Sequence, residues 1–339
     1  MTSRELALGV VGLGFGANHA RVLGDMDGVR LAAVCDADEA RLATIASGAS
    51  AYADIEAMLC GARLDAVVVA VPAGLHEAMA LACIRQGCAV LVEKPLAPSL
   101  AEGRRIVAAA ESADVPLMTG HIERFNPALQ ELARRVRAGE AGRVLQFSAR
   151  RAGAIRVPPA DVNVVHDSAL HDIDAMRFVL GAEVEEVYAG AQSGIVTPNE
   201  NAIVGQMRFD AVDGIAAIGA IEVNWLSPRR VRELTVLGER GLFVLDYAAQ
   251  TLDFYATPAT RTGPVQGWDA SRSAGAPEGM RIAVEPREQL VQELSAFAEA
   301  LRSHGAMPVS ARDALAALAV ADALTESTRI GRPVKPEAV

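Results

Sequence analysis

The sequence is poor in cysteine and lacks long apolar runs, and both absences narrow what the protein can be. Its four cysteines form no C-x-x-C pair and mostly lie in apolar runs of the first third. We therefore expect buried free thiols in a reducing compartment and no disulfide framework. No apolar run approaches bilayer-spanning length, and no cleavage-like site follows the apolar N-terminal stretch. A soluble, cytoplasmic protein without a membrane partner is expected.

Positive charge is also scarce. The chain has 42 Asp and Glu against 32 Lys and Arg, which gives a net charge of −10. This balance argues against nonspecific binding to nucleic acid, so any anionic ligand needs a local cluster of basic residues. The 339 residues, of which 51% are hydrophobic, are enough for two domains with sizeable cores.

A glycine-rich turn follows the first apolar run. The run at 7–11 leads into Gly12-Leu13-Gly14-Phe15-Gly16-Ala17, the G-x-G-x-x-A pattern of dinucleotide binding. Gly12 permits a tight turn, Gly14 lets the backbone approach a pyrophosphate, and Ala17 is small enough for close helix–strand packing. A pyrophosphate is expected at the N-terminus of the helix that starts here.

A second apolar strand ends in Asp36, about 20 residues after the glycine turn, where dinucleotide-binding domains place a ribose-binding carboxylate. Such a carboxylate accepts hydrogen bonds from the ribose hydroxyls of NAD and repels the 2′-phosphate of NADP. No arginine follows Asp36 directly, which favours NAD. Alternatively, Asp36 caps a helix that begins near Asp38.

Alternating strand and helix patterns continue to about residue 120. Apolar strands are predicted at 30–35, 65–71, 89–93 and 116–120, with helices at 74–86 and 99–112. Strands that are apolar on both faces are typical of a parallel sheet covered by helices. Residues 1–120 are therefore predicted to form an α/β, doubly wound, NAD-binding domain.

The pattern of residues 121–339 differs, which indicates a second, α+β domain. Short strands separated by turn residues indicate an antiparallel meander. The strands are predicted at 143–151, 184–192, 202–209, 214–224, 230–237, 241–247 and 251–255, a loose loop at 263–279, and helices at 127–138, 170–180, 286–304 and 311–329.

Glu93-Lys94-Pro95 follows an apolar strand of the first domain, at the end where open parallel sheets bind ligands. There, Lys94 is placed to exchange a proton with a substrate hydroxyl if its surroundings lower its pKa. The alternative is a surface lysine that opens a loop.

A second candidate site is the run Asp167-Ser168-Ala169-Leu170-His171-Asp172-Ile173-Asp174. The spacing predicts that Asp167, His171 and Asp174 lie on one helix face, where the carboxylates would orient the imidazole for general-base chemistry. A metal site and a capped, solvated helix start are the alternatives. With no further His or Cys at ligand spacing, no metal is predicted.

Together these motifs resemble the Gfo/Idh/MocA oxidoreductase family, in the right order over nearly the whole chain. The motifs are the glycine turn, Asp36, the segment from Val71 and Pro72 to His76, Glu93-Lys94-Pro95 and the D-x-x-x-H-x-x-D run. The family usually has glycine where Ala169 stands. The resemblance implies a Rossmann domain joined to a domain with a large, mostly antiparallel open sheet that supports homodimers or homotetramers.

The resemblance also implies roles for individual residues. Lys94 and His171 become an acid/base pair, with Asp167 as a catalytic or substrate-binding carboxylate. Pro95 is expected to be cis, and Glu93 is expected near the nicotinamide ribose. Predicted contacts to NAD come from Gly12, Gly14, Phe15, Gly16, Ala17, Asp36, Val71, Pro72, His76, Glu93 and Lys94.

Within the family, the segments 121–127, 149–151 and 222–226 are most similar to UDP-N-acetylglucosamine 3-dehydrogenases. This similarity implies a UDP-sugar substrate oxidised at C3 and a sugar aminotransferase as the next enzyme, on the way to the amide-linked lipid A. Substrate contacts are predicted from Asp167 and His171, and from a set of polar residues that comprises Arg124, Asn126, Arg151 and Arg156.

Alternatives to these substrate contacts remain. The arginines near residue 150 suit a diphosphate, but also an exposed basic loop or a subunit contact. Asn126 is equally placed to cap the helix that follows. The substrate alternatives are a UDP-sugar uronate, a free sugar or inositol. An alternative of another class is a dinucleotide-sensing regulator without catalysis.

Overall fold

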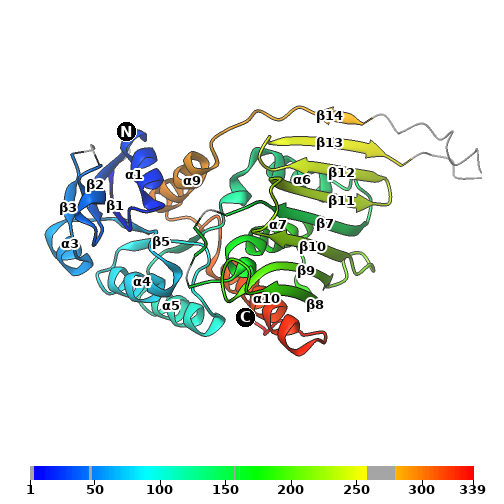
Figure 1. Ribbon diagram of the computed structural model, residues 1–339. Helices are drawn as coiled ribbons and strands as arrows, with labels where there is room; N and C mark the ends of the chain where they lie inside the picture. The colour runs from blue at the N-terminus through cyan, green and yellow to red at the C-terminus, as the bar shows by residue number, and fades with distance from the viewer. Residues whose placement is uncertain (1–3, 46–47, 156, 160, 258–278) are drawn as a thin grey trace, which may run out of the picture.

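The computed structural model describes residues 4–45, 48–155, 157–159, 161–257 and 279–339. Nearly all of the loop predicted at 263–279 lies outside this range, as does Arg156. The described chain builds two sheets that lie side by side, with helices α9 and α10 beside and between them (Figure 1).

The first sheet is wholly parallel, with strand order β3-β2-β1-β4-β5-β6. Strands β2 and β3 lie on one side of β1, and the chain then returns to build β4, β5 and β6 on its other side. This reversal creates a switch point between β1 and β4, where such sheets bind dinucleotides. The strands are β1 (Leu6–Val11), β2 (Val29–Cys35), β3 (Ser50–Tyr52), β4 (Ala66–Val69), β5 (Ala89–Glu93) and β6 (Leu117–Gly120). The helices of this part are α1 (Gly16–Asp25), α2 (Glu39–Leu42), α3 (Ile55–Gly61), α4 (His76–Arg85) and α5 (Leu100–Ser112).

The second sheet has eight strands in the order β14-β13-β12-β11-β7-β10-β9-β8, all antiparallel except the β7–β10 pair. Its strands are β7 (Val144–Ala152), β8 (Val184–Ser193), β9 (Glu200–Phe209), β10 (Ile218–Asn224), β11 (Val231–Gly238), β12 (Gly241–Asp246), β13 (Thr251–Ala256) and β14 (Met280–Ile282). Both sheets confirm the predicted fold class, although the sequence pattern did not reveal that β7 and β10 run parallel.

Helices cover one face of the second sheet and leave the other open. A single apolar core joins alternate strand residues to α6 (Pro127–Arg137), α7 (Leu170–Leu180) and α10 (Ala311–Ile330). The open face carries Tyr188, Val204 and Ile218, which are exposed. Among the described residues, no helix combines the length and the apolar character that crossing a bilayer requires.

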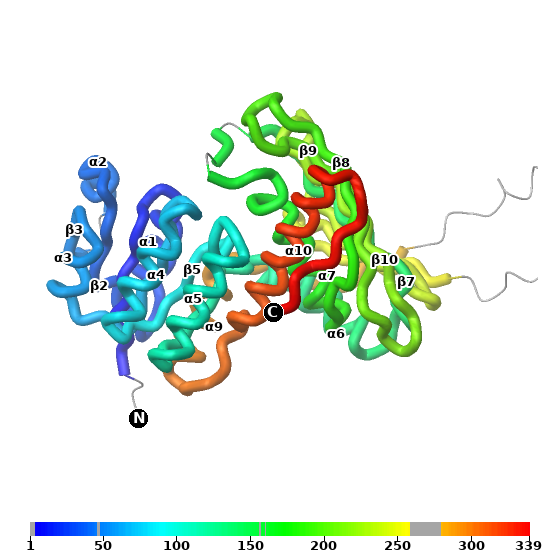
Figure 2. The backbone as a smooth tube through the Cα atoms, turned by 90° about the horizontal axis from the view of Figure 1, so that it is seen from below, coloured from blue at the N-terminus to red at the C-terminus, as the bar shows by residue number. Residues whose placement is uncertain are grey.

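The last two helices join the two parts of the chain. Leu294 and Phe297 of α9 (Gln289–Ser303) pack into the core of the first sheet. Helix α10 begins at a capping box made by Ser310 and Asp313. It places Leu315 in a core of the first part and Leu324 in the core of the second, and Figure 2 shows it lying between α5 and α7. The division of the chain at residue 120 stays a prediction.

Candidate active site

The glycine turn follows β1 at the switch point. Gly12 has a φ of +86°, and a Cβ at this position would lie 2.7 Å from the carbonyl oxygen of Ala70, so the turn requires glycine. A Cβ on Gly16 would meet Val10 and Ala70 at 3.0 and 3.1 Å, because α1 starts close against the sheet. Above Gly14 the space is open, with only the guanidinium of Arg41 within 4 Å. This open space over the turn suits a pyrophosphate.

Asp36 lies at the carboxyl end of β2, beside this turn. Its carboxylate accepts hydrogen bonds from the backbone N–H of Leu13 at 2.6 Å and of Asp38 at 2.8 Å. Burial opposes ionisation, but these N–H groups and Arg41, 3.5 Å away, outweigh burial and lower the pKa of Asp36. The cap of α2 is Asp38, which accepts from the N–H of Ala40, so the alternative role of Asp36 as that cap is wrong. A charged carboxylate here fits the ribose of NAD.

Two of the predicted NAD contacts are tied to the protein itself. Both ring nitrogens of the buried His76 lie within hydrogen-bond distance of carbonyl oxygens, Pro95 at 2.8 Å and Val71 at 2.9 Å. His76 therefore joins the loop after β4 to the loop after β5. Glu93 contacts Nε2 of His19 at 2.8 Å. Burial raises the pKa of Glu93, but His19 and Lys94 lower it further than burial raises it.

Lys94 is the first residue after β5, and its peptide bond to Pro95 is cis, as expected. Its Nζ donates to the backbone oxygen of Asp167 at 2.7 Å and to Oδ1 of the same residue at 2.9 Å. The structure thus brings together two predicted catalytic residues 73 positions apart in the sequence. This is also a direct bond between the two parts of the chain.

The Asp167 carboxylate is held by three donors. Besides Lys94, the hydroxyl of Ser168 donates to Oδ2 at 2.7 Å and the indole N–H of Trp225 at 3.1 Å. Burial alone would raise the pKa of Asp167, but these donors, Lys94 foremost, lower it. Ser168 and Trp225 were not predicted as site residues. Trp225 lies in a segment that the sequence singled out, but nothing local indicated its partner.

His171 has neither of the carboxylate partners that the spacing predicted. Asp167 lies in a π-helical turn, Val165–Ala169, ahead of α7, and its carboxylate serves Lys94. The wider π turn shifts the stacking of neighbouring residues. The Asp174 carboxylate instead accepts two hydrogen bonds from Arg124. The prediction of an imidazole oriented by two carboxylates is therefore wrong.

The surroundings of His171 keep its ring neutral. Burial is the largest cause that lowers its pKa well below 6.5, followed by the positive charges of Lys94 and Arg151. Its Nδ1 is buried without a hydrogen-bond partner in the described chain, and the residue as a whole is half-buried. A neutral imidazole is equipped to take a proton from a ligand.

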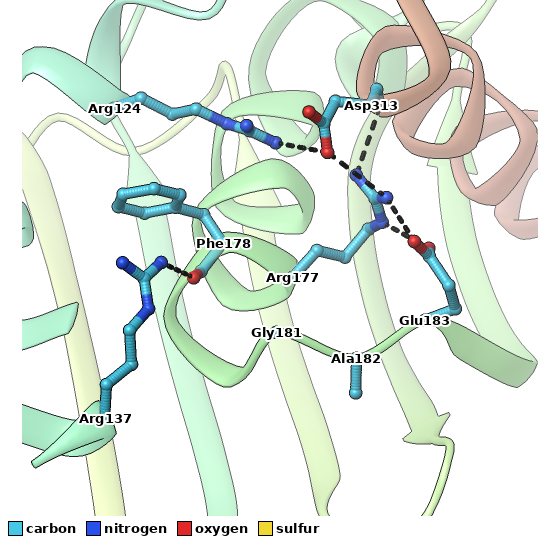
Figure 3. A pocket seen from close by; sticks show the side chains of 8 residues that line it. All are labelled: Arg124, Arg137, Arg177, Phe178, Gly181, Ala182, Glu183 and Asp313. Carbon is cyan, nitrogen blue, oxygen red and sulfur yellow. Dashed lines mark hydrogen bonds and ion pairs between the residues drawn. The ribbon is translucent and has the colours of Figure 1, made fainter. Parts of the chain in front are cut away.

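Two residues predicted to bind substrate are buried and engaged with other parts of the protein. Arg124 forms a two-pronged ion pair with Asp174 at 2.8 and 2.6 Å, and it also contacts Asp313 (Figure 3). Asn126 accepts from the N–H of Ala128 and donates to the carbonyl of Tyr247, so it caps α6. Because their polar groups are engaged, neither side chain is free for a substrate.

The arginines near residue 150 point to opposite faces of β7. Arg150 lies on the open face and pairs with Glu222 at 3.1 Å. Arg151 lies on the covered face, where Asp172 holds it at 2.7 and 3.1 Å and Glu123 at 3.1 Å. Arg151 was predicted to bind substrate, but in this geometry carboxylates of the protein itself engage its guanidinium. Arg156, the third, lies outside the described residues.

A glycine turn at a switch point, together with a lysine bonded to an aspartate near a buried histidine, is typical of a cofactor-dependent oxidoreductase. The model of an oxidoreductase family with an NAD-binding Rossmann fold, Gfo/Idh/MocA, matches residues 6–121, and that of the family's C-terminal domain matches 129–244. Inositol 2-dehydrogenase 2 of Saccharopolyspora erythraea is 33% identical over 96% of this chain and 93% of its own. D-apiose dehydrogenase of Paraburkholderia graminis is 30% identical over 96% and 88%. The chain belongs to the Gfo/Idh/MocA family and is an NAD-dependent oxidoreductase.

Solved structures share the fold over nearly the whole chain. UDP-N-acetylglucosamine 3-dehydrogenase from Acidithiobacillus ferrooxidans has a TM-score of 0.81 at 22% identity and covers 96% of this chain and 98% of its own. A dehydrogenase from Bordetella pertussis, in complex with NADH and UDP-GlcNAcA, has a TM-score of 0.83 at 24% identity over all of both chains.

Proposed function

We propose that the protein oxidises a ring hydroxyl group of a sugar or cyclitol, with NAD as the hydride acceptor. The observation that carries the proposal is the contact of Lys94 with Asp167, one turn before His171. Lys94 is one of only two lysines in the chain, whereas the other 30 residues of the Lys and Arg total of 32 are arginine. An ammonium group can exchange a proton where a guanidinium cannot, so a lysine at this point fits an acid/base role.

The geometry supports a separate role for each of Lys94, His171 and Asp167. Of the three N–H bonds of a Lys94 ammonium, two are used by Asp167, and the third is free for the substrate hydroxyl. The neutral His171 would accept the hydroxyl proton at Nε2 as the carbon–hydrogen bond breaks. NAD, when bound, supplies the hydride acceptor. Asp167 positions Lys94, and Ser168 and Trp225 fix Asp167.

For the substrate, we favour UDP-N-acetylglucosamine, oxidised at the C3 hydroxyl to a 3-keto sugar. The support comes from segments 121–127, 149–151 and 222–226, whose sequences resemble 3-dehydrogenases of this sugar. In that case a sugar aminotransferase follows, and the 3-amino sugar serves lipid A. The solved 3-dehydrogenase shares the fold, but at 22% identity its likeness does not select a substrate.

Inositol is the second candidate, because a full-length relative that is 33% identical is an inositol 2-dehydrogenase. Two further substrate candidates remain. One is a free sugar such as apiose, the substrate named for another relative, and the other is a UDP-sugar uronate.

A substrate panel tests the proposal. Purified protein is incubated with NAD and UDP-N-acetylglucosamine, its uronate, UDP-glucose, myo-inositol or apiose, and both NADH absorbance and product mass are followed. Loss of two hydrogens from UDP-N-acetylglucosamine alone supports the specific proposal. Turnover of inositol alone replaces the substrate and keeps the reaction class. No turnover of any compound, with NAD still bound, contradicts the proposal and favours a regulator.

The open face of the second sheet is the proposed contact between copies of the chain. Val204 and Ile218 on this face are 66% and 54% exposed, and an exposed apolar surface of a sheet favours association. We expect a homodimer or homotetramer, which light scattering after size exclusion measures directly. A monomer at micromolar concentration would contradict this expectation.

A further inference from the structure

One arginine near the start of β11 has no carboxylate at ion-pair distance among the described residues. Arg232 of β11 is paired in register with Arg151 of β7, so both side chains leave the same face of the sheet. That face is the helix-covered one, because Leu234 and Val236, which alternate with exposed or half-buried positions, belong to the core. Like charges directly opposite one another on neighbouring strands repel. The pair therefore requires counter-charges.

Two carboxylates lie at ion-pair distance from Arg151, whereas no carboxylate of the described residues lies so close to Arg232. Asp172 and Glu123 hold the Arg151 guanidinium, and the Tyr247 ring lies 5.0 Å from it. In contrast, Nη1 of Arg232 donates only to the carbonyls of Ala152 and Val231, both at 2.9 Å. No carboxylate within the described ranges lies at ion-pair distance from Arg232. Its Nε and Nη2 groups have no hydrogen-bond partner among the described residues.

Arg230 adds a second cation beside the first. It is exposed, and its charge contributes, after burial and Arg151, to the lowered pKa of Arg232. Among the described side chains, no carboxylate pairs with Arg230 either. The protein as a whole has a net charge of −10, so the half-buried Arg232 and the exposed Arg230, which have no ion-pair partner among the described residues, stand out as a local positive centre.

This positive centre adjoins the reacting groups. In register, Ala152 of β7 lies between Asn224 of β10 and Val231 of β11. Trp225, the residue that follows β10, donates to Asp167. Arg232 thus lies at the same end of these strands as Trp225, and its charge acts on His171.

We infer that Arg232, assisted by Arg230, forms an oxyanion subsite that selects substrates carrying a phosphate or carboxylate over neutral polyols. The inference rests on the proposed function and names the substrate class of the same site. A guanidinium presents planar, paired N–H donors that match either group. The oxyanion is the diphosphate of a nucleotide sugar or the carboxylate of a sugar acid, and a neutral cyclitol offers no partner for it.

Binding to the NAD-saturated protein tests the subsite without relying on turnover. Calorimetry is carried out with UDP, D-glucuronate and myo-inositol on wild type, Arg232→Gln and Arg232→Lys. The matched control is Arg150→Gln, the same change on the open face of the same sheet. We expect Arg232→Gln to weaken binding of the oxyanion ligand by about 10- to 100-fold. Arg232→Lys should recover part of the loss, and Arg150→Gln should bind like wild type.

Each outcome separates one possibility. Arg232-dependent binding of UDP identifies a nucleotide diphosphate, and Arg232-dependent binding of glucuronate alone identifies a sugar carboxylate. The subsite is overturned if neither oxyanion binds wild type, or if folded Arg232→Gln binds them as tightly. Melting temperatures establish that each variant is folded. The substrate panel measures turnover, whereas calorimetry measures binding. If no compound of the panel is turned over but UDP still binds in an Arg232-dependent way, the proposed reaction is wrong and the subsite stands.

Discussion

The two ends of α7 carry charged residues of the same kinds and use them in opposite ways. At its start, His171 has an unpartnered Nδ1, and the Lys94 ammonium keeps one N–H bond free. Towards its end, Arg124 and Arg177 form ion pairs with Asp174, Asp313 and Glu183 in a closed network, and Figure 3 shows all of these residues except Asp174. Free hydrogen-bonding capacity, rather than charge, therefore distinguishes the end where we propose that the chemistry takes place from the end that supports the fold.

Lys94→Met removes the ammonium group beside the start of α7 and should have the largest effect on turnover. The change removes the ammonium while keeping an unbranched side chain, so turnover of the substrate identified by the panel should fall about 10²- to 10⁴-fold. NAD binding should persist, because the glycine turn and Asp36 are untouched. Steady-state rates and cofactor titration measure the two quantities.

The chain offers a matched control, because Lys335 is the other lysine and lies exposed near the C-terminus. Lys335→Met should leave the rate unchanged. If Lys94→Met also leaves it unchanged, the acid/base role is wrong.

Arg124→Met disrupts the ion-pair network towards the end of α7. It leaves the buried Asp174 with only a distant contact to Arg177 at 3.8 Å and one to His121 at 3.7 Å. Removing one partner of a buried ion pair costs about 3–5 kcal/mol of unfolding free energy, measured by urea denaturation. The turnover of each folded molecule should be retained, since Arg124 does not reach the reacting groups.

The control for this variant comes from the same pocket. Arg137 donates to the carbonyl of Phe178, stacks on its ring and is exposed, so Arg137→Met should cost less than about 1 kcal/mol. Equal losses for the two variants would contradict the contrast between the ends of α7.

The comparison also shows which parts of the site the sequence can reveal. The glycine turn, Lys94 and Asp167 were predicted because each is a local motif at a strand end or helix start. Trp225 and Arg232, which belong to the site as we propose it, were missed because residues far apart in the sequence meet there, and Trp225 is 58 positions from Asp167. The alternation of side chains along β7 was visible in the sequence. It could have assigned Arg150 and Arg151 to opposite faces.

The pH dependence of kcat/KM sharpens the first half of the comparison. Burial and nearby cations hold the pKa of His171 well below 6.5, so the neutral, proton-accepting form persists as pH falls through 6.5. We expect a flat profile there and a tenfold loss per pH unit only at more acidic pH. An acid limb centred at 6.5 or above would contradict a neutral buried His171. Arg232→Gln removes one of the cations and should move the limb to higher pH.

Glu293 of α9 extends the comparison to a buried carboxyl that has no partner in the described chain at either oxygen. Burial, and then the nearby charge of Glu93, raise its pKa well above 4.5. The folded protein therefore holds a proton that the unfolded chain releases above pH 4.5, and stability falls as pH rises towards the folded-state pKa. The slope from one group is about 1.4 kcal/mol per pH unit. Glu293→Gln, which keeps the shape without the ionisation, should lose this slope in melts between pH 5 and 8. Parallel curves for the two proteins would show instead that Glu293 is charged and paired in solution.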